Sequence, residues 1–117
     1  MSEDKDDDKR IQKRVPADFV IEIYSANIGV LIGVAKLLNI SITGACIEST
    51  SAMAKGDAVT MRFLLGGEHL ISFLCTVKWA KENVRVREYG LKFESMNELN
   101  REIIRKFVQE YIEKPGF

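Results

Sequence analysis

The sequence predicts an all-β fold followed by a C-terminal helix, and three observations support this. Six short segments rich in β-branched and aromatic residues follow one another between residues 19 and 93. Turn-forming residues separate these segments, and from Ser95 onward the apolar residues recur with the period of a helix. Six short strands at this spacing favour a closed or nearly closed antiparallel barrel, which the helix would cap.

The strand segments can be placed in order along the chain. We expect strands over residues 19–24, 28–38, 44–49, 58–65, 70–80 and 85–93. The connecting turns are expected at residues 26–27, 55–57, 66–68 and 81–83, which contain the asparagine, glycine, aspartate and lysine typical of turns. Gly29 and Gly33 mark bends or bulges in the second strand.

The last segment is an amphipathic helix, expected over about residues 96–114. One apolar stripe contains Leu99, Ile103, Ile104, Phe107, Val108, Tyr111 and Ile112. Ser95 and Glu98 have the spacing of a capping box, and Pro115 and Gly116 end the helix after Lys114. The apolar face would cover the open end of the barrel, and binding of a partner protein is the alternative use.

Length and composition indicate one small domain. A chain of 117 residues that is 46% hydrophobic can bury a core without disulfide or metal. We expect a flexible acidic tail over residues 1–9, a domain over 10–114 and a short tail over 115–117. The net charge of zero and the pI near 6.6 argue against broad binding of DNA or RNA, which needs a dominant basic surface.

The reactive side chains do not form a catalytic or metal-binding pattern. Cys46 and Cys75 lie in apolar strand segments and are expected to be small buried hydrophobes in a reducing compartment. His69 is the only histidine, so neither a zinc site nor a nucleophile and base pair is expected. The acidic N-terminus does not resemble a signal peptide, and the apolar run 28–38 contains Lys36. We therefore expect a cytoplasmic protein that is not an enzyme, inserts into no membrane and needs no cofactor.

Two polar motifs flank the first two strands. Arg10 and Arg14 form an RxxxR motif, and Asn39, Ser41 and Gly44 form an NxSxxG motif after 24 intervening residues. The arginine fork fits the O6/N7 edge of guanine or a phosphate. The asparagine amide can meet the N1–H/N2–H edge of guanine less well than an aspartate, and the serine hydroxyl can meet a phosphate oxygen. The glycine permits positive φ and close approach of the backbone to a ligand.

This pair of motifs, with this separation, resembles the PilZ domain family of cyclic di-GMP receptors. The resemblance extends from about Arg10 to Lys114 and implies a six-stranded (split) β-barrel capped by a helix. It implies that Arg10, Arg14, Asn39, Ser41 and Gly44 bind cyclic di-GMP. It adds two further candidates: Lys9, the residue before RxxxR, and Trp79, whose ring could stack on a guanine.

The implied function is that of a receptor without chemistry of its own. Binding of the ligand by the two arginines would order the N-terminal segment and change its charge. An unidentified downstream protein would recognise this change. The process controlled would be motility or biofilm formation. The oligomeric state is left open. Arg62, Arg85, Arg87 and Lys92 lie on expected strands and could add positive charge to the site.

Other interpretations account for the same residues. A basic run beside an acidic tail can be a solvated chain end, and Asn39 and Ser41 can form an ordinary turn stabilised by side-chain hydrogen bonds. Trp79 can fill the barrel wall, where Val77 and Trp79 would share one face. As a whole, the protein could be a nucleotide-independent PilZ-like adaptor for another protein, or a flavin-binding split barrel, which would be yellow when purified.

Overall fold

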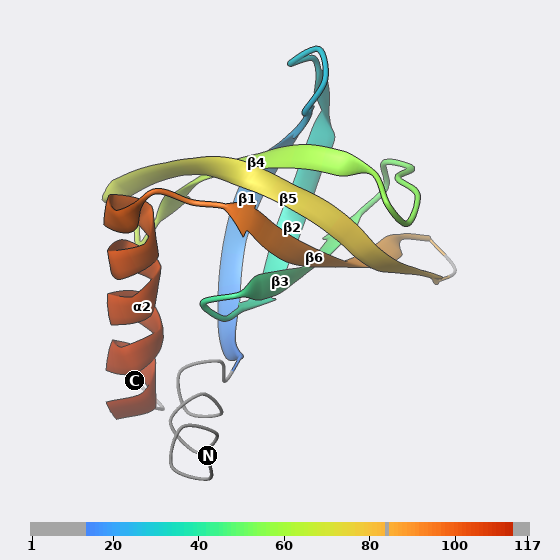
Figure 1. The fold of residues 1–117 in the computed structure, drawn as a ribbon. Helices are drawn as coiled ribbons and strands as arrows, with labels where there is room; N and C mark the ends of the chain where they lie inside the picture. The colour runs from blue at the N-terminus through green and yellow to red at the C-terminus, as the bar shows by residue number, and fades with distance from the viewer. Residues whose placement is uncertain (1–13, 84, 114–117) are drawn as a thin grey trace, which may run out of the picture.

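The computed structural model describes residues 14–83 and 85–113, and these form a closed β-barrel with one helix (Figure 1). The strands are β1 (Val15–Ser25), β2 (Leu31–Ile40), β3 (Gly44–Ser49), β4 (Ala58–Leu65), β5 (His69–Glu82) and β6 (Arg87–Ser95). Their order around the barrel is β1-β2-β3-β6-β5-β4, every pair is antiparallel, and β4 closes onto β1. The predicted all-β barrel with a C-terminal helix is confirmed.

Alternation along the strands creates the barrel core. In β4, buried residues at Val59, Met61, Phe63 and Leu65 alternate with residues of greater exposure. β5 pairs with β4 residue for residue and buries its own alternate positions from Ile71 to Val77. This period of two directs one face of each strand inward, so the apolar side chains of all six strands meet in one core.

The predicted bounds of β3 and β4 match the structure, whereas β1 and β2 are shifted. β1 begins at Val15, earlier than residue 19, because Val15 is buried and pairs with Ile40. β2 begins at Leu31 because residues 26–30 form a turn. In this turn the Gly29 N–H donates to the Ser25 carbonyl at 2.8 Å, and Gly29 adopts a φ of +70°. β5 continues to Glu82, which pairs with Arg87, so the turn to β6 begins at Asn83, the last of the expected residues 81–83.

The helix α2 (Glu98–Glu113) begins two residues after the predicted start, and its N-cap is Asn97. The Asn100 N–H donates to Asn97 Oδ1 at 2.7 Å, which is the bond that an N-cap side chain makes. The predicted capping box between Ser95 and Glu98 is wrong because Ser95 is still the last residue of β6. Lys114 and Pro115, where the helix was expected to end, lie outside the described residues.

One face of α2 packs on the barrel. Ile104 and Val108 are almost completely buried in the core, and the Phe107 ring lies 5.9 Å from that of Phe19 on β1. Phe19 in turn stacks on Phe63 of β4. The helix therefore covers one end of the barrel, as predicted (Figure 1). In the described residues, the structure contains no helix with the length and apolar character needed to cross a membrane.

Candidate functional site

The two sequence motifs meet where β1 begins and β2 ends. Antiparallel pairing places Pro16 opposite Asn39, which brings the preceding Arg14 to the same edge. The Arg14 guanidinium donates a hydrogen bond from Nη1 to Asn39 Oδ1 at 3.0 Å, and this contact is exposed to solvent. One arginine of the first motif and the first residue of the second therefore lie together.

Ser41 shapes the turn between β2 and β3 from inside. Its side chain is 2% exposed, and its hydroxyl oxygen accepts hydrogen bonds from the backbone N–H groups of Thr43 and Gly44, both at 3.2 Å. The same hydroxyl lies 3.2 Å from the Gly44 carbonyl, to which it can donate. These contacts fix the backbone of residues 41–44 and satisfy a buried polar group.

Gly44 is needed for a different reason from the one predicted. The described glycines with positive φ are Gly29, Gly56, Gly66 and Gly67, so Gly44 does not adopt the positive φ that a glycine permits. A Cβ at Gly44 would lie 2.5 Å from the carbonyl oxygen of Leu91, because β3 and β6 pair at this point. The close approach that requires glycine is therefore to the backbone of β6.

A continuous row of residues crosses the outer surface beside Arg14. The strand registers pair Asn39 with Cys46, Cys46 with Gly90, and Gly90 with Trp79. The indole of Trp79 covers Gly90, since a Cβ on Gly90 would overlap the ring. Trp79 is 40% exposed, so it does not fill the barrel core. The row therefore leads from the motif asparagine to an accessible aromatic ring.

A bulge in β5 explains why Trp79 faces outward. Val77 pairs with Leu91 and Trp79 with Gly90, so Lys78 is an extra residue between two consecutive pairs. A bulge of this kind changes the face on which the next side chain lies. Val77 is 1% exposed whereas Trp79 is accessible, and the prediction that these two residues share a face is wrong.

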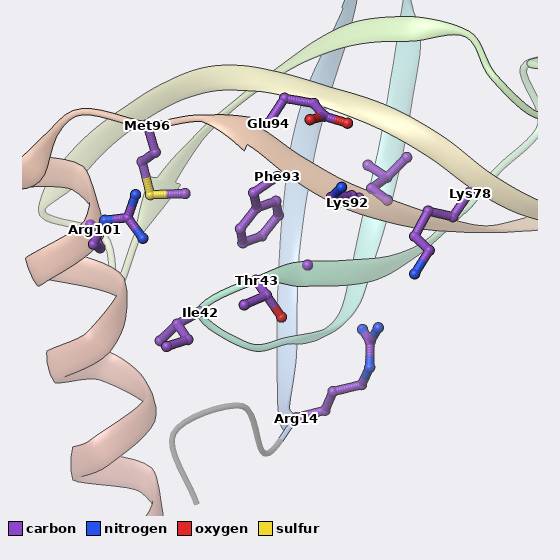
Figure 2. Close-up of a pocket in the computed structure, with 11 residues that line it drawn as sticks. Arg14, Ile42, Thr43, Lys78, Lys92, Phe93, Glu94, Met96 and Arg101 are labelled. Carbon is purple, nitrogen blue, oxygen red and sulfur yellow. The ribbon is translucent and has the colours of Figure 1, made fainter. Parts of the chain in front are cut away.

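Next to this row, the loop of residues 41–44 borders a hollow of about 310 Å³ (Figure 2). Its lining combines basic side chains with apolar ones, and includes Arg14, Ile42, Thr43, Gly44, Lys78, Leu91, Lys92, Phe93, Glu94, Met96 and Arg101. In Figure 2, Arg14, which lies just before β1, and Lys78, which lies on β5, extend toward one another, whereas Arg101 comes from α2. Four cations against one carboxylate make this hollow suited to an anion.

Three of these cations extend the predicted site, and one of them, Arg101, was missed because it reaches the hollow from α2. Lys92 was considered only as one of four strand cations, and it reaches the hollow because it pairs with Gly44 across β3 and β6. Lys78 was missed because its place depends on the bulge. The feature of the sequence that could have indicated Lys78 is its position directly before Trp79 in an expected strand. Arg62, Arg85 and Arg87 do not line this hollow.

The thiol of Cys46 lies on the row between Asn39 and Gly90 and is partly buried. Burial raises the pKa of the Cys46 thiol above its ordinary value, and the nearby Glu88 carboxylate adds to this rise. The Arg14 guanidinium opposes it. A raised pKa keeps the thiol neutral near pH 7, so the positive charge of the site is not reduced by a thiolate.

Lys9 and Arg10, the other predicted ligand residues, lie outside the described residues.

The fold and this site define a class of protein: a small antiparallel barrel, capped by a helix, with a basic hollow where the ends of β1, β2 and β3 meet. The sequence model of the PilZ domain family matches residues 8–110. The chain therefore belongs to the PilZ domain family. A search of curated proteins found no match to this chain.

Solved structures show the same fold at low sequence identity. The inhibitor of motility MotI from Bacillus subtilis superposes with a TM-score of 0.72 at 14% identity, covering 88% of this chain and 51% of MotI. The PilZ domain of YcgR from Escherichia coli, solved with c-di-GMP, gives a TM-score of 0.70 at 9% identity, covering 87% and 90% of the two chains. The PilZ domain of CeSA from a cellulose-synthesizing bacterium gives 0.65 at 15% identity, covering 86% and 98%. This chain spans about half the length of MotI.

Proposed function

We propose that this protein is a receptor for cyclic di-GMP. The observation that carries the proposal is the 3.0 Å hydrogen bond between Arg14 and Asn39, which joins the two motifs beside the basic hollow. Membership of the PilZ domain family supports the same ligand, as does the fold shared with the c-di-GMP-bound PilZ domain of YcgR.

The described residues would contribute to ligand binding in different ways. Arg14 presents a guanidinium that can hold a guanine edge or a phosphate, with Asn39 beside it. Lys78 and Lys92 would neutralise phosphate charge, and Trp79 would offer its exposed ring to a base. Arg10 and Lys9 are proposed as further ligand residues on sequence grounds alone.

Ser41 and Gly44 would serve this site through the backbone. The buried Ser41 hydroxyl holds the turn, and Gly44 lets β3 pair closely with β6 beside Lys92. Both residues therefore set the position of the loop that borders the hollow. In this arrangement neither side chain has to contact the ligand.

Ligand binding would signal through a change in surface charge and in the order of the segment that precedes β1. A dianionic ligand in the hollow cancels part of the charge of Arg14, Lys78, Lys92 and Arg101. A downstream protein that recognises the occupied surface would then distinguish bound from free receptor. The domain would act by binding and would carry out no chemistry.

Calorimetric titration of the full chain with cyclic di-GMP tests this function, with GTP and cyclic GMP as competing ligands. We expect micromolar or tighter binding of cyclic di-GMP alone. Arg14→Ala should weaken binding about 10- to 100-fold, because a hydrogen bond to a charged group contributes about 1.5–3 kcal/mol.

Arg105→Ala is the matched control, since Arg105 lies on α2 beside Glu102 and does not line the hollow. It should bind as the wild type does. A folded wild-type protein that gives no heat with cyclic di-GMP at high concentration contradicts the proposal and leaves the nucleotide-independent adaptor. Equal loss of binding in both variants would also contradict the role of Arg14.

A further inference from the structure

An apolar surface on the β1–β2 hairpin is not used by the candidate site. It consists of six exposed aliphatic residues, which we call the hairpin patch: Val20, Ile28, Val30, Leu31, Ile32 and Val34. Their exposure ranges from 36% for Ile32 to 74% for Val20 and Ile28. Exposed aliphatic residues gathered in one place mark an interaction surface more often than single ones do.

The strand register makes this surface continuous. Lys36 pairs with Val20 and Val34 with Glu22, so Val20 and Val34 are diagonal neighbours on the outer face. Residues 28–31 continue the patch toward the tip of the hairpin. This tip projects beyond the rest of the barrel at the top of Figure 1. The patch is therefore accessible to another molecule without movement of the barrel.

One edge of the hairpin is also open. Pairing between β2 and β3 in the described residues begins at Lys36, opposite Glu48, so residues 31–35 of β2 pair only with β1. The Val34 carbonyl accepts a hydrogen bond from Ser49 Oγ at 2.7 Å, and the Ser51 side chain lies against Gly33, which leaves Leu31 and Ile32 as the open part. Charged residues and proline usually protect such an edge, and residues 26–35 contain neither.

We propose that the hairpin patch is the interface of a symmetric homodimer, in which the hairpins of two copies pack antiparallel about an axis near Ile32. An antiparallel pair of identical strands is self-complementary, as a two-fold interface requires. A bulge leaves Ile32 without a partner on β1 and bends this edge. Packing of the aliphatic side chains therefore carries most of the contact, with few backbone hydrogen bonds.

The charge distribution favours a second copy as the occupant. The segment 26–35 is uncharged, so two copies meet there without repulsion. The charged residues that border the patch, Glu22 opposite Val34 and Lys36 opposite Val20, have opposite signs. With the axis at Ile32, the two Lys36 residues lie roughly 25 Å apart along the paired strands. This separation exceeds the screening length of about 8–10 Å, so these like charges do not oppose association.

The size of the patch is suited to a small dimer. A standard interface buries about 800 Å² on each partner. Six aliphatic side chains that are one third to three quarters exposed, together with the backbone that carries them, supply the larger part of such an area. Burial of this surface is favourable by about 25 cal/mol per Å², against the entropic cost of association.

Sedimentation velocity of the full chain over a range of concentrations tests this interface. We expect the wild type to shift from the 13.3 kDa monomer to a dimer of twice that mass as its concentration rises. Val34→Lys, which places a charge in the patch at an exposed position, should weaken dimerisation at least tenfold. Leu99→Lys is the control, because Leu99 is 69% exposed on α2, away from the hairpin. It should dimerise as the wild type does.

Three outcomes would overturn the proposal. One is a wild-type protein that stays monomeric at several hundred micromolar, and another is a dimer that Val34→Lys leaves unchanged. The third is a monomer that co-sediments with vesicles of phosphatidylglycerol and phosphatidylethanolamine, which would make lipid the occupant. Circular dichroism of each variant establishes that the barrel is folded. The test does not involve cyclic di-GMP, so its result is independent of the proposed function.

Discussion

At the scale of single residues, Asn39 determines how much charge Arg14 retains. Its amide oxygen accepts a hydrogen bond from the guanidinium, which orients the arginine without neutralising it. An aspartate at this position would orient Arg14 more strongly but would cancel part of its charge. The asparagine therefore leaves a cation available to an anionic ligand, at the cost of a weaker hold on the arginine.

Ser41 provides a residue-scale prediction. In Ser41→Ala the N–H groups of Thr43 and Gly44 lose the hydroxyl that accepts their hydrogen bonds. An unsatisfied buried donor costs about 1–3 kcal/mol, so we expect the free energy of unfolding to fall by that amount. We also expect weaker binding of cyclic di-GMP, because the loop of residues 41–44 borders the hollow. Urea unfolding measures the first effect and calorimetry the second.

Ser72→Ala is the matched control, since Ser72 is an exposed residue of β5 whose backbone carbonyl, and not its side chain, accepts the bond from Asn100. It should change the free energy of unfolding by less than about 0.5 kcal/mol. If Ser41→Ala kept full stability, the turn would not depend on the buried hydroxyl. If it kept full affinity at reduced stability, the loop would not position the ligand.

At the scale of elements, the sequence predicts where strands occur better than how they turn. The bounds of β3 and β4 follow from alternation between clear turn residues. The outward position of Trp79 could not be predicted in this way. The bulge at Lys78 arises from pairing with β6, and the alternation of residues within β5 does not indicate it. Asn97 caps the helix in place of Ser95 for a similar reason. The end of β6 is fixed by pairing with β5, as Ser95 pairs with Leu74.

Part of the candidate site could likewise be predicted from the sequence, whereas the rest depends on contacts between residues far apart in the chain. The meeting of Arg14 and Asn39 could be predicted from motif spacing, because 24 residues that form two antiparallel strands return the chain to its starting edge. Lys92 lies 48 positions from Gly44, and only the β3–β6 register brings them together. Lys78 depends on the bulge and Arg101 on the packing of α2. These long-range contacts are absent from local patterns.

The contact between Trp79 and Gly90 yields an element-scale prediction. Gly90→Ala would place a methyl group where the indole lies, and the exposed ring would have to move off β6. Trp79 is the only tryptophan, so its fluorescence reports this movement directly, and we expect emission at longer wavelength. Affinity for cyclic di-GMP should fall as well, if the ring is held ready for stacking on a base.

Trp79→Phe in the wild-type background separates the two effects. A phenylalanine keeps a flat ring beside Gly90, so this variant should retain most of the affinity that Gly90→Ala loses. Unchanged emission in Gly90→Ala would show that the indole does not rest on Gly90. Unchanged affinity, with a clear change in emission, would remove Trp79 from the binding site.

At the scale of the whole molecule, the stability of the barrel depends on an apolar core that includes a thiol. Cys75 is completely buried, and burial raises the pKa of its thiol far above the ordinary value of 9.0. The unfolded chain releases this proton above pH 9, whereas the folded chain keeps it. The unfolded state then binds fewer protons than the folded state, so the free energy of unfolding must decrease as the pH rises above 9.

The decrease attributable to Cys75 should approach about 1.4 kcal/mol per pH unit above the pKa of the unfolded thiol. Urea unfolding between pH 7.5 and 10.5 measures it, with Cys75→Ala as the comparison because alanine does not titrate. The variant will be less stable at every pH, since it leaves a cavity, so the slopes rather than the absolute values are compared. Tyrosines and lysines contribute equally to both proteins, and the difference in slope isolates the buried thiol. Parallel pH profiles would mean that Cys75 ionises in the folded barrel, and that water reaches the core between β4 and β6.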